Sequence, residues 1–268
     1  MLNTIGFLGC GNMGGAIARA VCKAADPQNV WLANRTAAKA EALAAELGCN
    51  TTINDEVAGR CDLIFLAVKP QMMEELLAPL RFTLAERPSR FVLCGMAAGL
   101  SIARIQEMAG SDCPVIRIMP NTPASVGAGM IQYCTSNVTA EEEAEFLKLM
   151  APAGRLDAVP EGLIDAASCV SGCGPAWVYQ FIEALADGGV ACGLPRAKAQ
   201  EYAAQMVLGS AKLVLESGQH PGALKDAVCS PGGSTIQGVR VLEEKGLRGA
   251  VMDAVIASYN KTKEMGKG

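Results

Sequence analysis

The sequence contains very little histidine and few aromatic residues. Among its 268 residues there is one histidine, His220, and Phe, Trp and Tyr together make up 4% of the chain. A single histidine excludes a histidine-based metal centre and leaves His220 as the one imidazole that could act as a general base. Hydrophobic residues still make up 50% of the chain. We therefore expect a core built from Ala, Val, Leu, Ile and Met on closely packed elements.

The sequence also lacks long hydrophobic runs and clusters of basic residues. No apolar run reaches the ~18 residues that span a bilayer, and no basic segment precedes the first apolar stretch. The formal net charge is -4, whereas proteins that bind nucleic acid or anionic membranes usually carry a basic patch. We expect a cytoplasmic protein with neither nucleic-acid nor membrane partners.

Cysteine is plentiful, but its spacing is not that of a metal site. The chain has 11 cysteines and no CxxC pair. Cys169 and Cys173 would share a helical face, yet no second pair of ligands accompanies them, so we expect no metal. Scattered cysteines in odd number fit reduced thiols that act as small buried hydrophobes.

Residues 3–16, NTIGFLGCGNMGGA, predict a strand, a tight turn and a helix. In such a unit Gly9 allows the turn, Gly11 lets the backbone approach a pyrophosphate, and Gly14 lets the helix pack on the strand. The phosphates lie at the helix N-terminus, where unpaired N–H groups and the helix dipole favour anions. The motif alone could be a glycine-rich turn without a ligand, but the flanking strand and helix favour dinucleotide binding.

A second strand, residues 30–34, ends where a domain of this kind that prefers NAD carries an acidic residue. Here the chain has Asn34, Arg35 and Thr36 instead, and Thr36 should cap the next helix. A guanidinium with neighbouring amide and hydroxyl donors would hold a 2'-phosphate. We therefore expect NADP(H), with NAD(H) as the second candidate. The alternative is that Arg35 is an ordinary exposed arginine.

Further apolar stretches predict more strands, three of them buried, at 62–68, 91–99 and 114–123. The carboxyl ends of parallel strands meet at one edge of a sheet, where ligands bind. The residues expected to rim this cleft are Lys69, Pro70, Met96, Ala97, Ala98, Pro120 and Asn121, with Asn54 facing the same edge. Pro70 and Pro120 could instead only end strands, and Asn121 could only cap a turn. Shorter strands are expected at 49–53, 129–134 and 155–159.

After Pro160 the pattern is helical throughout, which predicts a domain of residues 1–160 with a sheet and an all-helical domain of residues 161–268. Two glycines and a proline in SGCGPAW, residues 171–177, should break a helix. Long apolar helices rich in Ala and Gly would leave unburied faces in a monomer, so we expect an obligate oligomer.

The sequence SPGGST, residues 230–235, precedes one of these helices. Two glycines followed by Ser and Thr at a helix start bring several N–H and hydroxyl donors to one point, which suits a carboxylate. The alternative is a loop in which Ser234 or Thr235 caps its own helix.

Several motifs together resemble the pyrroline-5-carboxylate reductase family. They are GCGNMG at 9–14, AVKPQ at 67–71, MAAG at 96–99, RIMPNTP at 117–123, SGCGPAW at 171–177 and LKDAVCSPGGSTIQG at 224–238. The resemblance implies an α/β Rossmann N-terminal domain, an all-α C-terminal dimerisation domain, and NAD(P)H-dependent reduction of 1-pyrroline-5-carboxylate to L-proline. It also implies a dimer, often assembled into a ring of five dimers. Cys173 and Trp177 stand where Ser and Tyr are more usual.

The resemblance also implies site residues. Cofactor contacts would come from Leu8, Gly9, Cys10, Gly11, Asn12, Met13, Asn34, Asn54, Ala67, Val68, Lys69, Pro70, Met96, Ala97 and Ala98, to which the strand-end argument adds Arg35. The substrate carboxylate would be held by Ser230, Gly232, Gly233, Ser234 and Thr235. Thr235 would lie near the ring nitrogen and orient it.

The scarcity of histidine fits this chemistry. A ketone reduction leaves an alkoxide that needs a proton donor, whereas a cyclic imine can arrive already protonated. Two alternatives remain at this point. One is a β-hydroxyacid dehydrogenase, which would need a catalytic lysine such as Lys198 or Lys212. The other is an NADP-sensing protein without turnover, which would have no reason to keep the SPGGST loop.

Overall fold

The structure, a computed structural model, describes residues 2–265 and divides into two compact units. The first comprises residues up to 173 together with those from 258 onward, and the second comprises residues 174–257. The sequence places a domain boundary at residue 160. In the structure the first unit extends to residue 173 instead, because the helix that follows Pro160 packs on its sheet.

The first unit is built on a sheet of eight strands in the order β3-β2-β1-β4-β5-β6-β7-β8. The strands are β1 (Ile5–Leu8), β2 (Val30–Ala33), β3 (Asn50–Thr51), β4 (Leu63–Leu66), β5 (Val92–Gly95), β6 (Val115–Met119), β7 (Gly129–Ser136) and β8 (Gly154–Ala158). Neighbouring strands are parallel except β6 and β7. The order 3-2-1-4-5-6 is that of a dinucleotide-binding fold. The predicted fold class is confirmed, and all eight expected strands are present.

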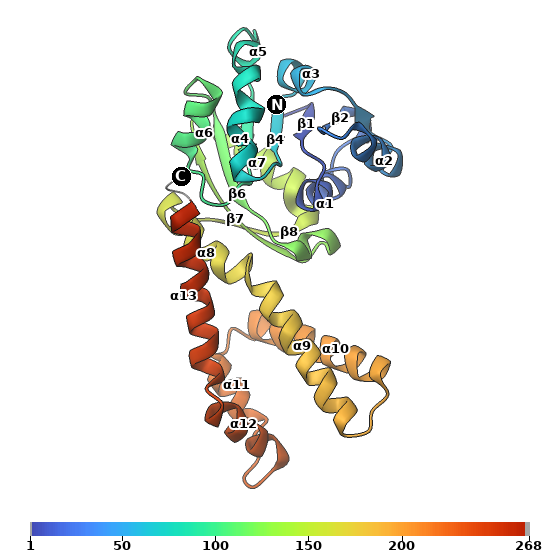
Figure 1. The fold of residues 1–268 in the computed structure, drawn as a ribbon, viewed down its shortest axis with the longest axis vertical. Coiled ribbons are helices and arrows are strands. Elements are labelled where there is room, and N and C mark those ends of the chain that lie inside the picture. The colour runs from blue at the N-terminus through green and yellow to red at the C-terminus, as the bar shows by residue number, and fades with distance from the viewer. Residues whose placement is uncertain (1, 266–268) are drawn as a thin grey trace. The chain divides into compact units, whose positions relative to one another are not determined.

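Helices cover both faces of this sheet (Figure 1). One face packs against α1 (Asn12–Val21), α2 (Ala37–Leu47) and α7 (Ala140–Met150). The other packs against α3 (Asn54–Arg60), α4 (Met73–Leu77), α5 (Arg81–Ala85), α6 (Ile102–Ala109) and α8 (Glu161–Ser171).

The central strands alternate their side chains between these two hydrophobic layers. In β4, Leu63 and Phe65 belong to the layer under α1, while Ile64 and Leu66 belong to the opposite one. Phe65 stacks on Phe7 of β1 with ring centroids 4.5 Å apart. All four β4 side chains are fully buried, which explains why the sequence there is continuously apolar.

The second unit is helical, and the helix breaks where the sequence predicts. Here α8 ends at Ser171 and α9 (Gly174–Ala191) begins three residues later, with Pro175 in the first turn, where its missing N–H costs nothing. The remaining helices are α10 (Arg196–Ser217), α11 (Pro221–Ala227), α12 (Ser234–Glu244) and α13 (Leu247–Met265), and α13 belongs to the first unit from residue 258 onward.

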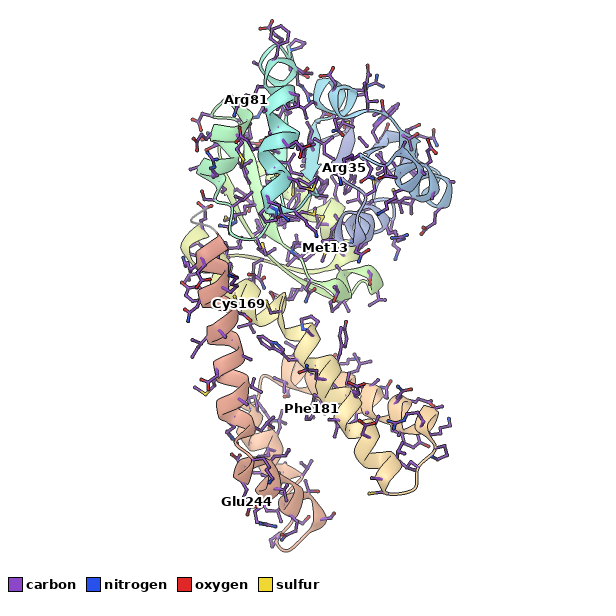
Figure 2. The ribbon with its side chains drawn as sticks, in the orientation of Figure 1. Met13, Arg35, Arg81, Cys169, Phe181 and Glu244 are labelled. Carbon is purple, nitrogen blue, oxygen red and sulfur yellow. The ribbon has the colours of Figure 1, made fainter. Side chains whose placement is uncertain are left out.

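Small residues bring α9 and α10 together, as expected from the composition. Ala186, Ala199 and Ala203 are the buried hydrophobic residues of this unit, and a side chain added at Gly189 would lie 3.2 Å from the Cβ of Ala199. Many large side chains stay exposed, including Phe181 at 39% and Leu208 at 60%. The apolar side chains of α9, Phe181 among them, project from the helix (Figure 2). This much exposed apolar surface is typical of a subunit interface.

Thr36 is the N-cap of α2, as predicted, although its side chain makes no capping hydrogen bond and the amide of Lys39 bonds the backbone carbonyl of Thr36. One expectation about local structure is wrong. Not all cysteines are buried: Cys192 is exposed, and Cys10, Cys22, Cys49, Cys173 and Cys229 are half-buried. All 11 are free thiols.

Candidate functional site: a cleft at the carboxyl ends of β1, β2 and β4

Gly9 and Gly14 have the close-packing roles predicted for them, and the pyrophosphate contact of Gly11 stays a prediction. Gly9 has a φ of +113°, and a Cβ there would lie 2.5 Å from the carbonyl oxygen of Ala67. A Cβ at Gly14 would collide with the carbonyl of Gly9, so this glycine sets how closely α1 approaches the turn. At Gly11 nothing lies within 4 Å of an added Cβ. Gly11 therefore presents bare backbone to open space at the start of α1, where an anionic group would fit.

Asn34 joins this turn to the one after β2. Its side-chain oxygen accepts a hydrogen bond from the Cys10 amide at 3.0 Å, and its side-chain amide donates to the carbonyl of Thr36 at 2.9 Å. The sequence predicts that the Asn34 amide is a donor to a phosphate. One of its two N–H groups is already bonded within the protein, and a contact from Asn34 to a cofactor stays a prediction.

A cleft of about 590 Å³ opens beside these turns. Its lining includes Leu8, Gly9, Gly11, Asn34, Arg35, Thr36, Lys39, Asn54, Ala67, Val68 and Lys69, with Gln71, Met72, Glu75 and Leu76 on the remaining wall. The cleft thus contains Arg35 and eight of the other residues expected to contact the cofactor. Cys10 and Asn12 line a smaller adjoining hollow that shares Gly11 and Lys39 with the cleft.

The cleft carries three basic side chains, Arg35, Lys39 and Lys69, and one acidic side chain, Glu75. Arg35 precedes the N-terminus of α2 and Lys39 follows one turn later, so both flank the end of β2. The sequence motifs do not predict Lys39 as a cleft residue. The signal that points to it is its place in the first turn of the helix after β2, at the edge of the sheet where ligands bind.

Other expected contacts do not line this cleft. Ala97 is 4% exposed and lies in the hydrophobic layer under α6, while Met96 and Ala98 pack against the two layers. Met13 packs against the core, and Pro70 begins a short 3-10 helix after β4. Contacts from these residues to a cofactor stay predictions.

Asn121 has a structural role. It is buried, its side-chain amide donates to the carbonyl of Ser171 at 2.9 Å, and its side-chain oxygen accepts from the amide of Met130 at 3.1 Å. Neither Asn121 nor Pro120 lines the cleft. The expectation that both rim it is wrong, because Asn121 is turned inward to tie α8 to the start of β7.

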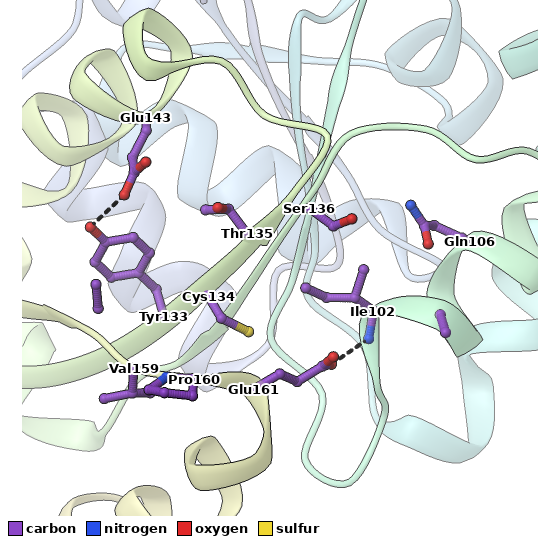
Figure 3. A pocket seen from close by; sticks show the side chains of 12 residues that line it. Ile102, Gln106, Tyr133, Cys134, Thr135, Ser136, Glu143, Val159, Pro160 and Glu161 are labelled. Carbon is purple, nitrogen blue, oxygen red and sulfur yellow. Dashed lines mark hydrogen bonds between the residues drawn. The ribbon is translucent and has the colours of Figure 1, made fainter.

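A second cleft, of about 620 Å³, lies between β7, α6 and the start of α8 (Figure 3). It contains none of the expected site residues. Its carboxylates are already bonded: Glu143 accepts from the Tyr133 hydroxyl at 2.8 Å, and Glu161 accepts from the Ile102 amide at 2.7 Å. Two carboxylates and no glycine turn make it unsuited to a dinucleotide.

The SPGGST loop presents donors without side-chain caps. Gly233 is the N-cap of α12, no side chain caps this helix, and the Gly233 amide bonds the Ser230 carbonyl at 3.0 Å. Ser230, Ser234 and Thr235 are exposed on the second unit. Neither Ser234 nor Thr235 caps α12 with its side chain, so the capping alternative is wrong.

Within residues 2–265, no group of three or more His, Cys, Asp or Glu side chains is placed to hold a metal ion. No helix in the same range is long and apolar enough to cross a membrane.

Comparison with known proteins decides the family. Residues 161–265 match the family model for pyrroline-5-carboxylate reductase dimerisation, and residues 4–89 match that for NADP oxidoreductase, coenzyme F420-dependent. The chain is 43% identical to pyrroline-5-carboxylate reductase of Escherichia coli over 271 aligned positions that cover 100% of both chains. The chain belongs to the pyrroline-5-carboxylate reductase family. The resemblance predicted from its motifs is confirmed.

Solved structures of the pyrroline-5-carboxylate reductase family agree with the fold. The Plasmodium falciparum pyrroline carboxylate reductase, solved with NADP bound, is 35% identical, covers 99% of each chain and superposes with a TM-score of 0.89. The Coxiella burnetii pyrroline-5-carboxylate reductase is 31% identical, covers 100% of each chain and also has a TM-score of 0.89. The helical half of this chain is accordingly the dimerisation domain of the family.

Proposed function

We propose that this protein reduces 1-pyrroline-5-carboxylate to L-proline with a hydride from NADPH, the last step of proline biosynthesis. The observation that carries the proposal is the glycine turn beside a basic cleft, on a chain whose full length matches reductases of this name. The competing β-hydroxyacid dehydrogenase assignment has no comparable support.

The residues of the cleft fit a phosphorylated dinucleotide. Open backbone at Gly11 suits the pyrophosphate, and Arg35 and Lys39 give two cations to a 2'-phosphate. Bound there, NADPH would supply the hydride. Asn34 would fix the two turns relative to each other rather than contact the phosphate directly.

On the second unit, Ser230 and Gly232–Thr235 are the residues that we assign to the substrate carboxylate. The first-turn N–H groups of α12 have no side-chain acceptor, so they are available to an anion. With the carboxylate held, the Thr235 hydroxyl would hydrogen-bond the ring nitrogen and orient the C=N bond. The chain's contribution to catalysis would be mainly positioning, since a protonated imine needs no further acid.

Self-association belongs to the same proposal. The dimerisation domain leaves large apolar side chains exposed on α9, α10, α12 and α13, which a second subunit would cover. We further assign a ring of five such dimers and a cytoplasmic location, where 11 free thiols would stay reduced.

One assay separates the possibilities. Purified protein is mixed with NADPH and 1-pyrroline-5-carboxylate, and separately with NADP and a 3-hydroxy acid, while NADPH absorbance is followed. Loss of absorbance in the first mixture supports the proposal. A gain of absorbance in the second mixture alone would identify a β-hydroxyacid dehydrogenase. NADPH binding without turnover in either mixture would identify a sensor.

A further inference from the structure

The cleft beside the glycine turn has two chemically different walls. One wall is formed by the glycine turn and the start of α2, and it carries the cations Arg35 and Lys39. The other, here called the α4 wall, is formed by α4 and by the short 3-10 helix η2 (Pro70–Met72) that precedes it. Its residues are Gln71, Met72, Glu75 and Leu76. The phosphates of the proposed cofactor use only the first wall.

The residues of α4 and η2 divide between the protein core and the cleft. Met73 and Leu77, four residues apart, are fully buried in the hydrophobic layer on this face of the sheet. Met72 and Leu76, also four residues apart, are only half-buried and line the cleft. Apolar side chains of this kind gain stability when a flat apolar group covers them and removes them from water. The α4 wall therefore suits an aromatic ring better than a phosphate.

The phosphate contacts indicate which ring reaches the α4 wall. This step rests on the function proposed above, in which Arg35 and Lys39 hold the 2'-phosphate of NADPH. The sugar carbon that carries this phosphate is bonded directly to the carbon that carries adenine, so the base lies in the same part of the cleft. Val68, which also lines the cleft, adds apolar surface to that of Met72 and Leu76.

Glu75 carries a charge of the wrong sign for phosphates. Among the described residues that line the cleft, it is the one with a carboxylate. The preceding residue, Glu74, accepts a hydrogen bond from Arg81 at 2.8 Å and lies 3.7 Å from Arg104. Within residues 2–265, Glu75 forms no such ion pair or side-chain hydrogen bond. A free carboxylate weakens phosphate binding in this cleft, so a favourable role for it requires a hydrogen-bond donor on the ligand.

We propose that Glu75 recognises the base of the cofactor, its carboxylate accepting a hydrogen bond from the 6-amino group of adenine while Met72 and Leu76 cover the ring. An ionised carboxylate can only accept, and the 6-amino group is the N–H donor of an adenine that is linked to its sugar. A base with a carbonyl oxygen at that position places an acceptor against an acceptor. Glu75 is thus a specificity-determining residue that selects adenine over hypoxanthine.

The test measures binding rather than turnover. The purified protein is titrated with NADPH and with deamino-NADPH, which has hypoxanthine in place of adenine, and the fluorescence of the reduced nicotinamide is followed. We expect the unaltered protein to bind NADPH roughly 10-fold more tightly than the analogue. In Glu75→Gln the ratio should fall to about two or less, because glutamine offers a donor as well as an acceptor.

The ratio of the two affinities separates the base contact from the charge of Glu75. Removing a negative charge from the cleft should strengthen the binding of both dinucleotides equally, through their phosphates, and this effect cancels in the ratio. Glu74→Gln is the matched control, since it makes the same change one position earlier and outside the cleft, and it should keep the ratio. Gln71→Ala should keep it as well. Glu75 is exposed, so its substitution leaves the core unchanged.

Three results would overturn the assignment of Glu75. In the first, the unaltered protein binds both dinucleotides equally well. In the second, Glu75→Gln binds both more tightly with an unchanged ratio, which would mean that Glu75 acts only through its charge. In the third, Gln71→Ala loses the ratio and Glu75→Gln keeps it. These results leave the proposed function in place, whereas a lack of NADPH binding to the unaltered protein would overturn both.

Discussion

The side-chain oxygen of Asn34 accepts a hydrogen bond from the backbone amide of Cys10 at 3.0 Å. This contact couples the glycine turn after β1 to the turn that carries Arg35, so the pyrophosphate region and the proposed 2'-phosphate region are held as one surface. Asn34→Ala leaves the Cys10 amide without its partner, at a cost of about 1 kcal/mol or roughly fivefold in affinity. We expect the loss to be the same for NADPH and NADH, measured by fluorescence titration.

The matched variant Asn34→Asp tests the same contact differently. It keeps an acceptor for the Cys10 amide but adds negative charge to the cleft, so NADPH binding should weaken more than NADH binding. Unequal losses in Asn34→Ala would mean that Asn34 touches the 2'-phosphate after all.

Arg35 and Lys39 should determine the preference for NADPH. Reversing either charge, in Arg35→Asp or Lys39→Glu, removes a charge-assisted bond and should lower NADPH affinity by about 2 kcal/mol, roughly 30-fold, with a much smaller effect on NADH. Lys23→Glu, an exposed lysine after α1, controls for overall charge. Equal losses for the two cofactors in Arg35→Asp would remove the argument for NADPH.

Thr235 should matter for turnover rather than for folding. We expect Thr235→Ala to lower kcat/KM by about 10-fold or more, which corresponds to ~1.4 kcal/mol. Thr235→Ser keeps a hydroxyl and should retain most of the activity. Full kcat/KM in Thr235→Ala would falsify the assigned role.

The buried guanidinium of Arg117 should be the most sensitive charge in the first unit. It is 3% exposed, pairs with Asp165 and lies 3.4 Å from Glu161, and its Nε has no partner. Asp165→Ala would leave a buried charge without its main counter-ion, at a cost of about 3–5 kcal/mol in free energy of unfolding. The exposed pair Glu56–Arg60 is the control, and Glu56→Ala should cost at most about 0.5 kcal/mol in a urea titration.

Glu142 should contribute a pH-dependent part of the stability. Burial raises its pKa, but hydrogen bonds from Arg90 and from the Thr139 amide outweigh burial, so the pKa is lowered overall. A carboxyl whose folded pKa lies below its unfolded value of about 4.3 stabilises the protein above that value and loses the effect as pH falls through the folded pKa. The difference in unfolding free energy between the unaltered protein and Glu142→Gln should therefore shrink below about pH 4. A difference independent of pH would show that Glu142 acts only through packing.

Much of the fold could be predicted from local pattern. Strands covered on both faces are continuously apolar, so β4, β5 and β6 were found, but each was predicted too long: 62–68 became Leu63–Leu66. The error arises because small and apolar residues continue into the loops at the ligand edge. The turn at Gly9 and the close packing at Gly14 are predictable because backbone geometry within one turn decides them.

Contacts between distant residues could not be predicted. The role of Asn34 depends on an amide 24 positions away, and that of Asn121 on a carbonyl 50 positions away. The prediction that the cysteines are buried is wrong for the same reason. Composition does not show that Cys192 lies on an exposed turn after α9.

The alternation of side chains in β4 has a consequence for how this chain can change. Removing one residue inside that strand would turn Phe65 away from Phe7. It would also move the β4 side chains on one side of the deletion to the opposite hydrophobic layer. The lengths of the central strands are therefore fixed by packing. Substitutions that change cofactor preference have to lie in the turns that follow the strands.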